Sequence, residues 1–386
     1  MGRCRTRFGT CVEVLPCDNQ EIIQFITVGL LLGKHICLYT RKEFDMKDKK
    51  NLSVGIDLGT SNLLIYVEGQ GTLFNEPSII AIDKATQKVV SVGHEAAKLV
   101  GKTHDKVEVV RPLQGGVISD IQLIREILLF TMEKIFLSDL QAISRLLICI
   151  PSEITNTEKE AIIELGHSLG IQQTEIQEEI KAAALGSGVD IFAPQGHMII
   201  DTGGGTTDFG ILSLGDVVLS KSIKIAGDFF DRQIIDYVKT AHKLEIGSQT
   251  AEQIKVTLSS LTGPYPVDED GEPLIFEAMG RDLVSGLPRR TVLGTEEIRE
   301  VLLNCFDAVK SVLLTTLEET PPELAGDLVD NGILITGGGS QIPGIREFIA
   351  DTAKVPVYLS EVPITAVIDG CKKMLKMTNR HFYSEL

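Results

Sequence analysis

Two aspartates in this 386-residue sequence are each followed by a short run of small and hydroxyl residues. Asp57 begins the run Asp-Leu-Gly-Thr-Ser-Asn, and Asp201 begins the run Asp-Thr-Gly-Gly-Gly-Thr-Thr-Asp. Glycines let main-chain N–H groups approach a ligand closely, and successive N–H groups in a turn form a concavity that binds anions. An aspartate in such a turn repels phosphate, but it suits a magnesium ion that is held largely through water. The two runs therefore predict a site for a magnesium-bound phosphate compound.

The elements that must position these runs are short strands. Each run, and a third glycine run at residues 336–340, directly follows an apolar segment; these segments are residues 52–56, 198–200 and 333–335. The first two runs lead into a second apolar stretch, which predicts two strand–turn–strand hairpins, whereas a helix is predicted after the third, over residues 345–353. Ordinary tight hairpins would explain one such run, but hardly three in this order. Apolar runs that alternate with amphipathic segments indicate an α/β fold with two related halves that face one nucleotide.

Composition excludes several classes of protein. Asp and Glu total 53 against 37 Lys and Arg, so the net charge of −16 argues against a nucleic-acid partner. A hydrophobic content of 43% excludes a disordered chain. Four of the seven cysteines fall before residue 38, and Cys149, Cys305 and Cys371 are widely spaced. This pattern predicts a reduced, cytosolic protein without disulfides.

Residues 1–45 differ from the rest of the chain. Their apolar run, residues 22–33, is shorter than the roughly 20 residues of a transmembrane helix. We expect this segment to be an extension that adds no fold, either disordered or the result of a start codon assigned too early, with Met46 as the natural first residue. The alternative is an N-terminal leader segment that binds the membrane.

The glycine runs and several further segments resemble the superfamily of actin, sugar kinases and heat-shock chaperone ATPases, and within it the MreB family of bacterial actins. The similarity extends in family order from about residue 52 to residue 375; its segments are residues 55–62, 75–78, 111–118, 201–208, 225–228, 286–289, 320–324 and 336–340. The resemblance implies an actin-like ATPase fold with two lobes. Each lobe would contain a mixed five-stranded sheet with helices, and the nucleotide would lie in the cleft between the lobes.

The resemblance also implies four subdomains. Their expected limits are residues 46–80, 123–193 and 363–386 for IA, 81–122 for IB, 194–229 and 292–362 for IIA, and 230–291 for IIB.

ATP and magnesium are the ligands that this resemblance implies. Asp57 and Asp201 would hold the magnesium ion, largely through water. The phosphates would be bound by Gly59, Thr60, Ser61, Asn62, Gly203, Gly204, Gly205 and Thr206. Glu252 would bind the ribose and Lys255 would flank the base, and the adenosine site would be completed by Gly337, Gly338 and Gly339. The spacing of Thr250 and Gln253 predicts a capping box that starts the helix carrying Glu252 and Lys255.

Glu179 matches the family glutamate that orients the attacking water, and Thr206 and Asp201 complete the expected catalytic group. A structural role for Glu179 is the alternative, and the preceding Glu178 is expected to be a solvated charge at the helix start. The family normally has a proline where this chain has Ile180, and an apolar residue in place of Lys181. Because a proline there fixes the helix entry angle, its absence is expected to leave Glu179 less firmly held, which affects hydrolysis but not nucleotide binding. The hydrolysis rate is expected to be low.

Three functions are compatible with this superfamily. A cytoskeletal ATPase would polymerise into filaments and maintain cell shape by organising cell-wall synthesis, with itself and membrane-bound cell-shape and cell-wall proteins as partners. A sugar-type kinase would need an acceptor pocket with a general base, and a chaperone would need a substrate-binding region after the lobes; neither is recognisable. We therefore expect the filament protein, in the cytoplasm at the inner face of the membrane. Direct membrane contact would rely on Leu137, Leu140 and Ile143, or on residues 22–33. Alternatively, a membrane-bound partner would recruit the filament.

Overall fold

The computed structural model describes residues 4–5, 11–12, 51–103, 105–136, 140–151 and 154–377. The chain divides into two compact units, Met1–Lys49 and Lys50–Leu386. In the first unit, β1 (Cys4–Arg5) pairs antiparallel with β2 (Cys11–Val12). The apolar run at residues 22–33 lies outside the described residues.

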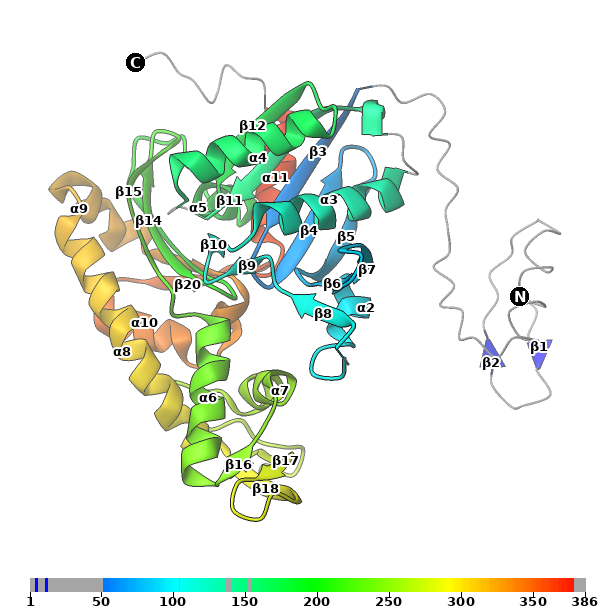
Figure 1. Ribbon diagram of the computed structural model, residues 1–386. Coiled ribbons are helices and arrows are strands. Elements are labelled where there is room, and N and C mark those ends of the chain that lie inside the picture. Colours follow the sequence, from blue (N-terminus) through cyan, green and yellow to red (C-terminus); the bar gives the residue numbers. More distant parts are fainter. Residues whose placement is uncertain are drawn as a thin grey trace. The chain divides into compact units, whose positions relative to one another are not determined.

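The first large sheet has the order β12-β11-β3-β4-β5 (Figure 1). Its strands are β3 (Leu52–Leu58), β4 (Asn62–Val67), β5 (Gly71–Pro77), β11 (Ile143–Ile150) and β12 (Gln173–Glu178). β3, β4 and β5 are antiparallel neighbours, whereas β11 runs parallel to both β3 and β12. The sheet is therefore mixed, and the nearly continuous apolar sequences of β3 and β11 are those of strands buried on both faces.

The second large sheet repeats this plan, with the order β15-β14-β13-β19-β20. Its strands are β13 (His197–Thr202), β14 (Thr207–Ser213), β15 (Asp216–Ile223), β19 (Ile333–Thr336) and β20 (Val357–Leu359). β13, β14 and β15 are antiparallel, and β19 runs parallel to β13 and β20. The predicted α/β fold with two mixed five-stranded sheets is confirmed.

Helices cover these sheets. Those of the first half are α3 (Ile121–Phe136) and α4 (Asn156–Ser168), and those of the second are α6 (Gly227–Ala241), α8 (Thr295–Glu319), α9 (Pro322–Asn331) and α10 (Ile345–Ala353). The helix predicted over residues 345–353 is confirmed. In the second half, the rings of Phe230 and Phe306 stack with centroids 5.4 Å apart, which ties α6 to α8.

Two small three-stranded sheets extend from the large ones. One contains β6 (Ile80–Asp83), β7 (Val89–Val92) and β8 (Val107–Val110) beside α2 (Gly93–Ala97). The other contains β16 (Leu244–Glu245), β17 (Ile275–Asp282) and β18 (Pro288–Gly294) beside α7 (Ser248–Leu258). A separate hairpin joins β9 (Leu113–Gln114) to β10 (Val117–Ile118). The four subdomain limits given above stay predictions.

The capping box predicted at Thr250 is wrong. α7 begins at Ser248, with Gly247 in an extended conformation as its N-cap and no side-chain cap. Because glycine is an acceptable N-cap, the helix starts three residues earlier than predicted and places Thr250 within its first turn.

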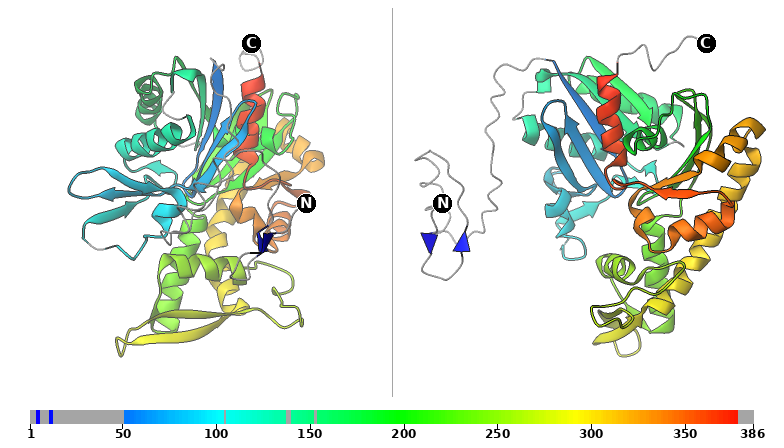
Figure 2. Two further views of the ribbon diagram at one scale, coloured as in Figure 1. Left: turned by 90° about the vertical axis from the view of Figure 1, so that its right-hand side faces the viewer. Right: turned by 180° about the vertical axis from the view of Figure 1, so that it is seen from behind.

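Two helices fill the space between the large sheets. α5 (Glu179–Gly186) and α11 (Ala366–Lys376) share one apolar cluster with residues from both sheets, including Leu147 of the first and Ile199 of the second. They cross so closely that a side chain at Gly186 would overlap the Ala366 carbonyl, and one at Gly370 would overlap the Ala182 carbonyl. Figure 2 shows α11 in red beside the blue strands of the first sheet. Backbone contact at two glycines therefore makes α5 and α11 a rigid pair.

Gly370→Ala is expected to lower the free energy of unfolding by about 2–4 kcal/mol, because the new methyl group meets backbone that cannot turn aside. Gly326→Ala is the matched control, since it lies in α9 with open space around it. There the same change should stabilise the protein by up to about 1 kcal/mol. Urea unfolding of both variants measures the difference, and equal effects would contradict the tight crossing.

Candidate functional site

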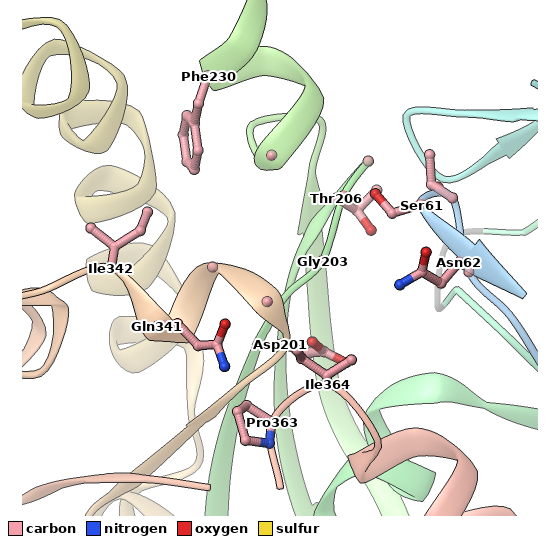
Figure 3. A pocket seen from close by; sticks show the side chains of 18 of the residues that line it. Ser61, Asn62, Asp201, Gly203, Thr206, Phe230, Gln341, Ile342, Pro363 and Ile364 are labelled. Atoms are coloured by element: carbon pink, nitrogen blue, oxygen red, sulfur yellow. The ribbon is translucent and has the colours of Figure 1, made fainter. Parts of the chain in front are cut away.

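A cavity of about 510 Å³ lies between the hairpins β3–β4 and β13–β14 (Figure 3). It is also lined by the N-terminal ends of α5 and α6, by α7, and by the short helix η3 (Gly338–Gln341). Figure 3 shows Ser61 and Asn62 on one side, with Gln341 and Ile342 on the other. Every site residue predicted from the sequence lines this cavity. The volume is within the range of small-molecule sites.

The two hairpin turns approach each other closely enough to require glycine. A side chain at Gly204 would overlap Ser61, and one at Gly205 would overlap Thr60. The turn of one hairpin thus packs directly on the turn of the other, and residues of both turns line the cavity. This contact joins the two halves of the fold at the floor of the cavity.

A third turn, which the sequence analysis did not assign to the site, closes over this contact. In the β9–β10 hairpin, the Gly116 N–H donates to Thr60 Oγ1 at 3.3 Å. Gly116 has φ 70°, and a side chain there would overlap the methyl group of Thr206. The paired Gly115 and Gly116 were a local signal of a tight turn, but only the tertiary structure places that turn on Thr60 and Thr206.

Three carboxyl groups converge on the cavity, from the buried Asp57 and Asp201 and from the half-buried Glu179. Burial raises the pKa of Asp57 to about 7 and that of Asp201 to about 8, and in Asp201 the charges of Asp208 and Asp57 contribute to the increase. Asp201 and Asp208 are direct cross-strand neighbours in β13 and β14. Burial, followed by the charges of Asp57, Asp208 and Asp201, also raises the pKa of Glu179 well above its ordinary value. Without a cation, these carboxyl groups repel one another.

A magnesium ion fits this arrangement. Glu179 Oε1 is buried without a hydrogen-bond partner, so the site holds a polar atom that a water on a bound ion could satisfy. Within the described ranges, no three His, Cys, Asp or Glu side chains are grouped to hold a metal by themselves. Magnesium does not need such a group, since it keeps several waters and binds through one or two carboxylates and phosphates. Asp57 and Asp201 are the carboxylates that could hold it.

Glu179 is the first residue of α5, and its neighbours fix the start of this helix. Ile180 is fully buried and packs against Gly210 of β14, where an added side chain would meet it at 2.7 Å. Lys181 is buried, and its Nζ lies 3.6 Å from Asp216 Oδ1. Both contacts reach strands of the second sheet. In the absence of the family proline, they hold the helix start that carries Glu179.

The expectation that Glu178 is solvated is wrong. Glu178 is the N-cap of α5 and is half-buried, and its Oε2 is enclosed without a hydrogen-bond partner. Burial raises the pKa of this carboxyl group. The change from strand β12 directly into α5 leaves no exposed turn in which the side chain could reach water.

Lys255 of α7 has a partner that the sequence analysis missed. Its Nζ lies 2.9 Å from Asp231 Oδ1 and donates to the Gly227 carbonyl at 3.1 Å. Asp231 lies on α6, and burial raises its pKa to about 6 even though Lys255 opposes this. Asp231 therefore fixes the ammonium group of Lys255 against α6 at the wall of the cavity.

The comparisons with known proteins agree with this geometry. The family described as "MreB/Mbl protein" matches residues 51–382. The chain belongs to the MreB/Mbl family, and the resemblance found in the sequence is confirmed. It is similar to the cell shape-determining protein Mbl of Bacillus subtilis, with 42% identity over 83% of this chain and 95% of that protein. It is also similar to the cell shape-determining protein MreB of Escherichia coli K12, with 38% identity over 85% of this chain and 94% of that protein.

Solved structures of MreB relatives support the same fold. MreB5 of Spiroplasma citri, solved with AMPPNP and with ADP, is 39% identical and superposes with a TM-score of 0.79. The superposition with the AMPPNP-bound structure covers 84% of this MreB/Mbl chain and 96% of the MreB5 chain. A double helical filament of MamK has a TM-score of 0.71 at 20% identity, which supports the fold alone.

Asp201→Asn is expected to raise the melting temperature of the metal-free protein at about pH 8, and to raise it less at about pH 5. Because burial raises the pKa of Asp201 from 3.8 to about 8, the folded state keeps a proton that the unfolded state loses. The free energy of unfolding therefore falls as the pH rises between these values, and a neutral amide removes that loss.

Thermal unfolding in a chelator at both pH values measures this effect. Asp236→Asn is the control, since Asp236 is exposed on α6. A shift from Asp201→Asn that is equal at the two pH values would contradict the raised pKa.

Proposed function

We propose that this MreB/Mbl chain binds ATP with magnesium in the cavity between its two halves and hydrolyses it slowly. The observation that carries the proposal is the convergence of the buried Asp57 and Asp201 and the half-buried Glu179 on two glycine turns that face each other. The nucleotides bound to the MreB5 relative support ATP as the ligand. Hydrolysis by an NTPase depends mainly on positioning and charge neutralisation, which such a cavity supplies.

In this proposal, the main-chain N–H groups and hydroxyls of the two turns bind the phosphates. Their donors are Gly59, Thr60, Ser61, Asn62, Gly203, Gly204, Gly205 and Thr206. Asp57 and Asp201 would hold water molecules of the magnesium shell, and the ion when bound neutralises charge on the phosphates. The glycine contacts between the turns fix both sets of donors before the nucleotide arrives.

Glu179 would orient the water that attacks the terminal phosphate. Its unpartnered Oε1 can accept a hydrogen bond from that water, and Thr206 on the opposite side can provide a second contact. Because α5 begins at Glu179, any change in the packing of Ile180 and Lys181 moves this carboxyl group directly. Both placement and charge matter, since the carboxylate must hold the water in line with the phosphate and can accept a proton from it.

At the other end of the cavity, we place the adenosine. Glu252 would accept hydrogen bonds from the ribose, and Lys255, fixed by Asp231, would flank the base. Gly337, Gly338 and Gly339 line the same end. Gly337 has φ 80°, and a side chain there would overlap the Thr202 carbonyl and Asp201. The strand end must therefore stay free of side chains to pass so close to β13.

We further propose that the chain polymerises head to tail and helps to maintain cell shape. The names of the Mbl and MreB relatives support a cell-shape role, and the MamK filament shows that this fold can assemble. A head-to-tail contact that does not close into a ring propagates as a filament. Its partners would be membrane-bound cell-shape and cell-wall synthesis proteins at the inner face of the cytoplasmic membrane. The family assignment favours this role over that of a sugar-type kinase.

For direct membrane contact, one of the expected residues is unsuitable. Ile143 begins β11 and is 2% exposed, because it packs inside the first sheet. Leu137 and residues 22–33 lie outside the described residues. Among the described helices, none has the length and apolar character needed to cross a membrane. Because Ile143 is buried, the route that we propose is recruitment by a membrane-bound partner.

Glu179→Gln is expected to keep ATP affinity near that of the wild type and to lower turnover about 100- to 10,000-fold, the usual effect of losing a group that activates water. Glu178→Gln is the matched control, since Glu178 precedes it in the chain but does not line the cavity. Phosphate release and fluorescent-nucleotide binding measure the two quantities. Unchanged turnover would remove Glu179 from the water-orienting role.

The protein is expected to sediment as filaments with magnesium and ATP, and to stay in the supernatant without nucleotide. Electron microscopy of the pellet shows whether the material is filamentous. Transfer of phosphate to a sugar without any sedimentation would contradict the filament and support the kinase alternative.

A further inference from the structure

Two buried cysteines that are far apart in sequence are in contact. Cys149 of β11 and Cys371 of α11 place their Sγ atoms 3.0 Å apart. Both side chains are fully buried in the cluster between the two large sheets. At this distance the two thiols form a hydrogen bond with each other, in which either can be the donor.

This pair is directly behind the proposed metal site. Cys149 is the parallel neighbour of Asp57 in the pairing of β11 with β3. Cys371 lies over the same strand, where a side chain at Gly55 would meet its Cβ at 3.0 Å. A movement of either thiol is therefore transmitted to the strand that carries Asp57.

We propose that Cys149 and Cys371 form a reversible disulfide that inactivates the nucleotide site. The oxidant would be a small disulfide such as oxidised glutathione. One cysteine thiolate attacks it, breaks its S–S bond, releases one small thiol and remains as a mixed disulfide. The second cysteine then attacks this intermediate and releases the second small thiol. Two protein thiols are thus oxidised to one disulfide, while one small disulfide is reduced to two thiols.

The disulfide needs a small displacement of α11. An S–S bond is about 2.05 Å long, so the sulfur atoms must approach by about 1 Å. Because α11 and α5 meet backbone to backbone at Gly186 and Gly370, α5 cannot stay in place when α11 moves. Glu179 is the first residue of α5. Oxidation therefore displaces the proposed water-orienting group on one side and strains the strand of Asp57 on the other.

Burial sets the conditions for this reaction. The hydrogen bond with Cys371, together with burial, keeps the pKa of Cys149 well above its ordinary value, which favours the thiol in the closed protein. A small disulfide can reach the pair only when the end of α11 opens. We therefore expect slow oxidation over minutes to hours, and a stable reduced protein in ordinary reducing conditions.

The chain supplies its own control cysteine. Cys305 is also buried, but it lies in α8, where its Sγ donates to the Val301 carbonyl at 3.2 Å. Its contact is within its own helix, and it belongs to the separate cluster of the second half. Cys305→Ala should thus respond to oxidation as the wild type does.

The first test is chemical and does not depend on the proposed function. The full chain is incubated with oxidised glutathione, free thiols are blocked, and tryptic peptides are mapped by mass spectrometry. The expected product joins the peptide of residues 146–159 to that of residues 355–372, about 2 Da lighter than the sum of the two reduced peptides. Mapping separates this product from any disulfide of the four cysteines before residue 38. Absence of this cross-linked peptide from folded, oxidised wild type would overturn the proposal.

The second test rests on the proposed ATPase activity. Oxidised wild type should hydrolyse ATP about 10- to 100-fold more slowly, as expected for a displacement of about 1 Å at a positioned group, and dithiothreitol should restore it. Cys371→Ala should show no change on oxidation, whereas Cys305→Ala should lose activity as the wild type does. A mapped disulfide with unchanged turnover would overturn its inhibitory role. Failure of the reduced protein to bind ATP would instead contradict the proposed function, and the peptide map would still decide the disulfide.

Discussion

The structure depends on the burial of several carboxyl groups opposite one another. Asp57, Asp201 and Glu179 come from three elements, and all three are enclosed where their charges repel. Their burial and mutual repulsion raise the pKa of each group, so the carboxylate forms are destabilised in the folded protein. In the proposed function, a divalent cation with its waters and a phosphate chain would remove this repulsion. Ligand binding would then stabilise the cavity and be linked to the relation between the two halves of the fold.

Glycine makes this arrangement possible through close approach as well as through backbone freedom. Gly204 and Gly205 let one phosphate turn touch the other, and Gly116 lets a third turn cover them. Any side chain at these positions would push apart the two halves that a ligand must bridge. The same device recurs between α5 and α11, where Gly186 and Gly370 bring two backbones together. These contacts explain how a displacement of α11 can reach Glu179, the proposed water-orienting group, at the start of α5.

Ile180 and Lys181 stand where the family has a proline and an apolar residue, and in this chain they fix the start of α5 in a different way. A proline would set the first turn of α5 locally, whereas Ile180 and Lys181 hold it through contacts with Gly210 and Asp216 of the second sheet. The position of Glu179 then depends on how the two halves pack, and not on the helix alone. This gives a physical reason why turnover in this chain could respond to the relation between its halves.

The sequence by itself determined the features that rest on local signals. Apolar strands ending in Asp-x-Gly turns predicted both hairpins, and glycine spacing with the family resemblance identified the residues that line the cavity. Only the tertiary structure decided the pairs whose members are distant in sequence: Asp231 with Lys255, the Gly116 turn with Thr206, and Cys149 with Cys371. It also decided the burial of Glu178 and Ile143, and the start of α7 at Ser248. The local sequence determines short-range periodicity and turn chemistry. Burial and long-range contacts arise only when separate elements pack together.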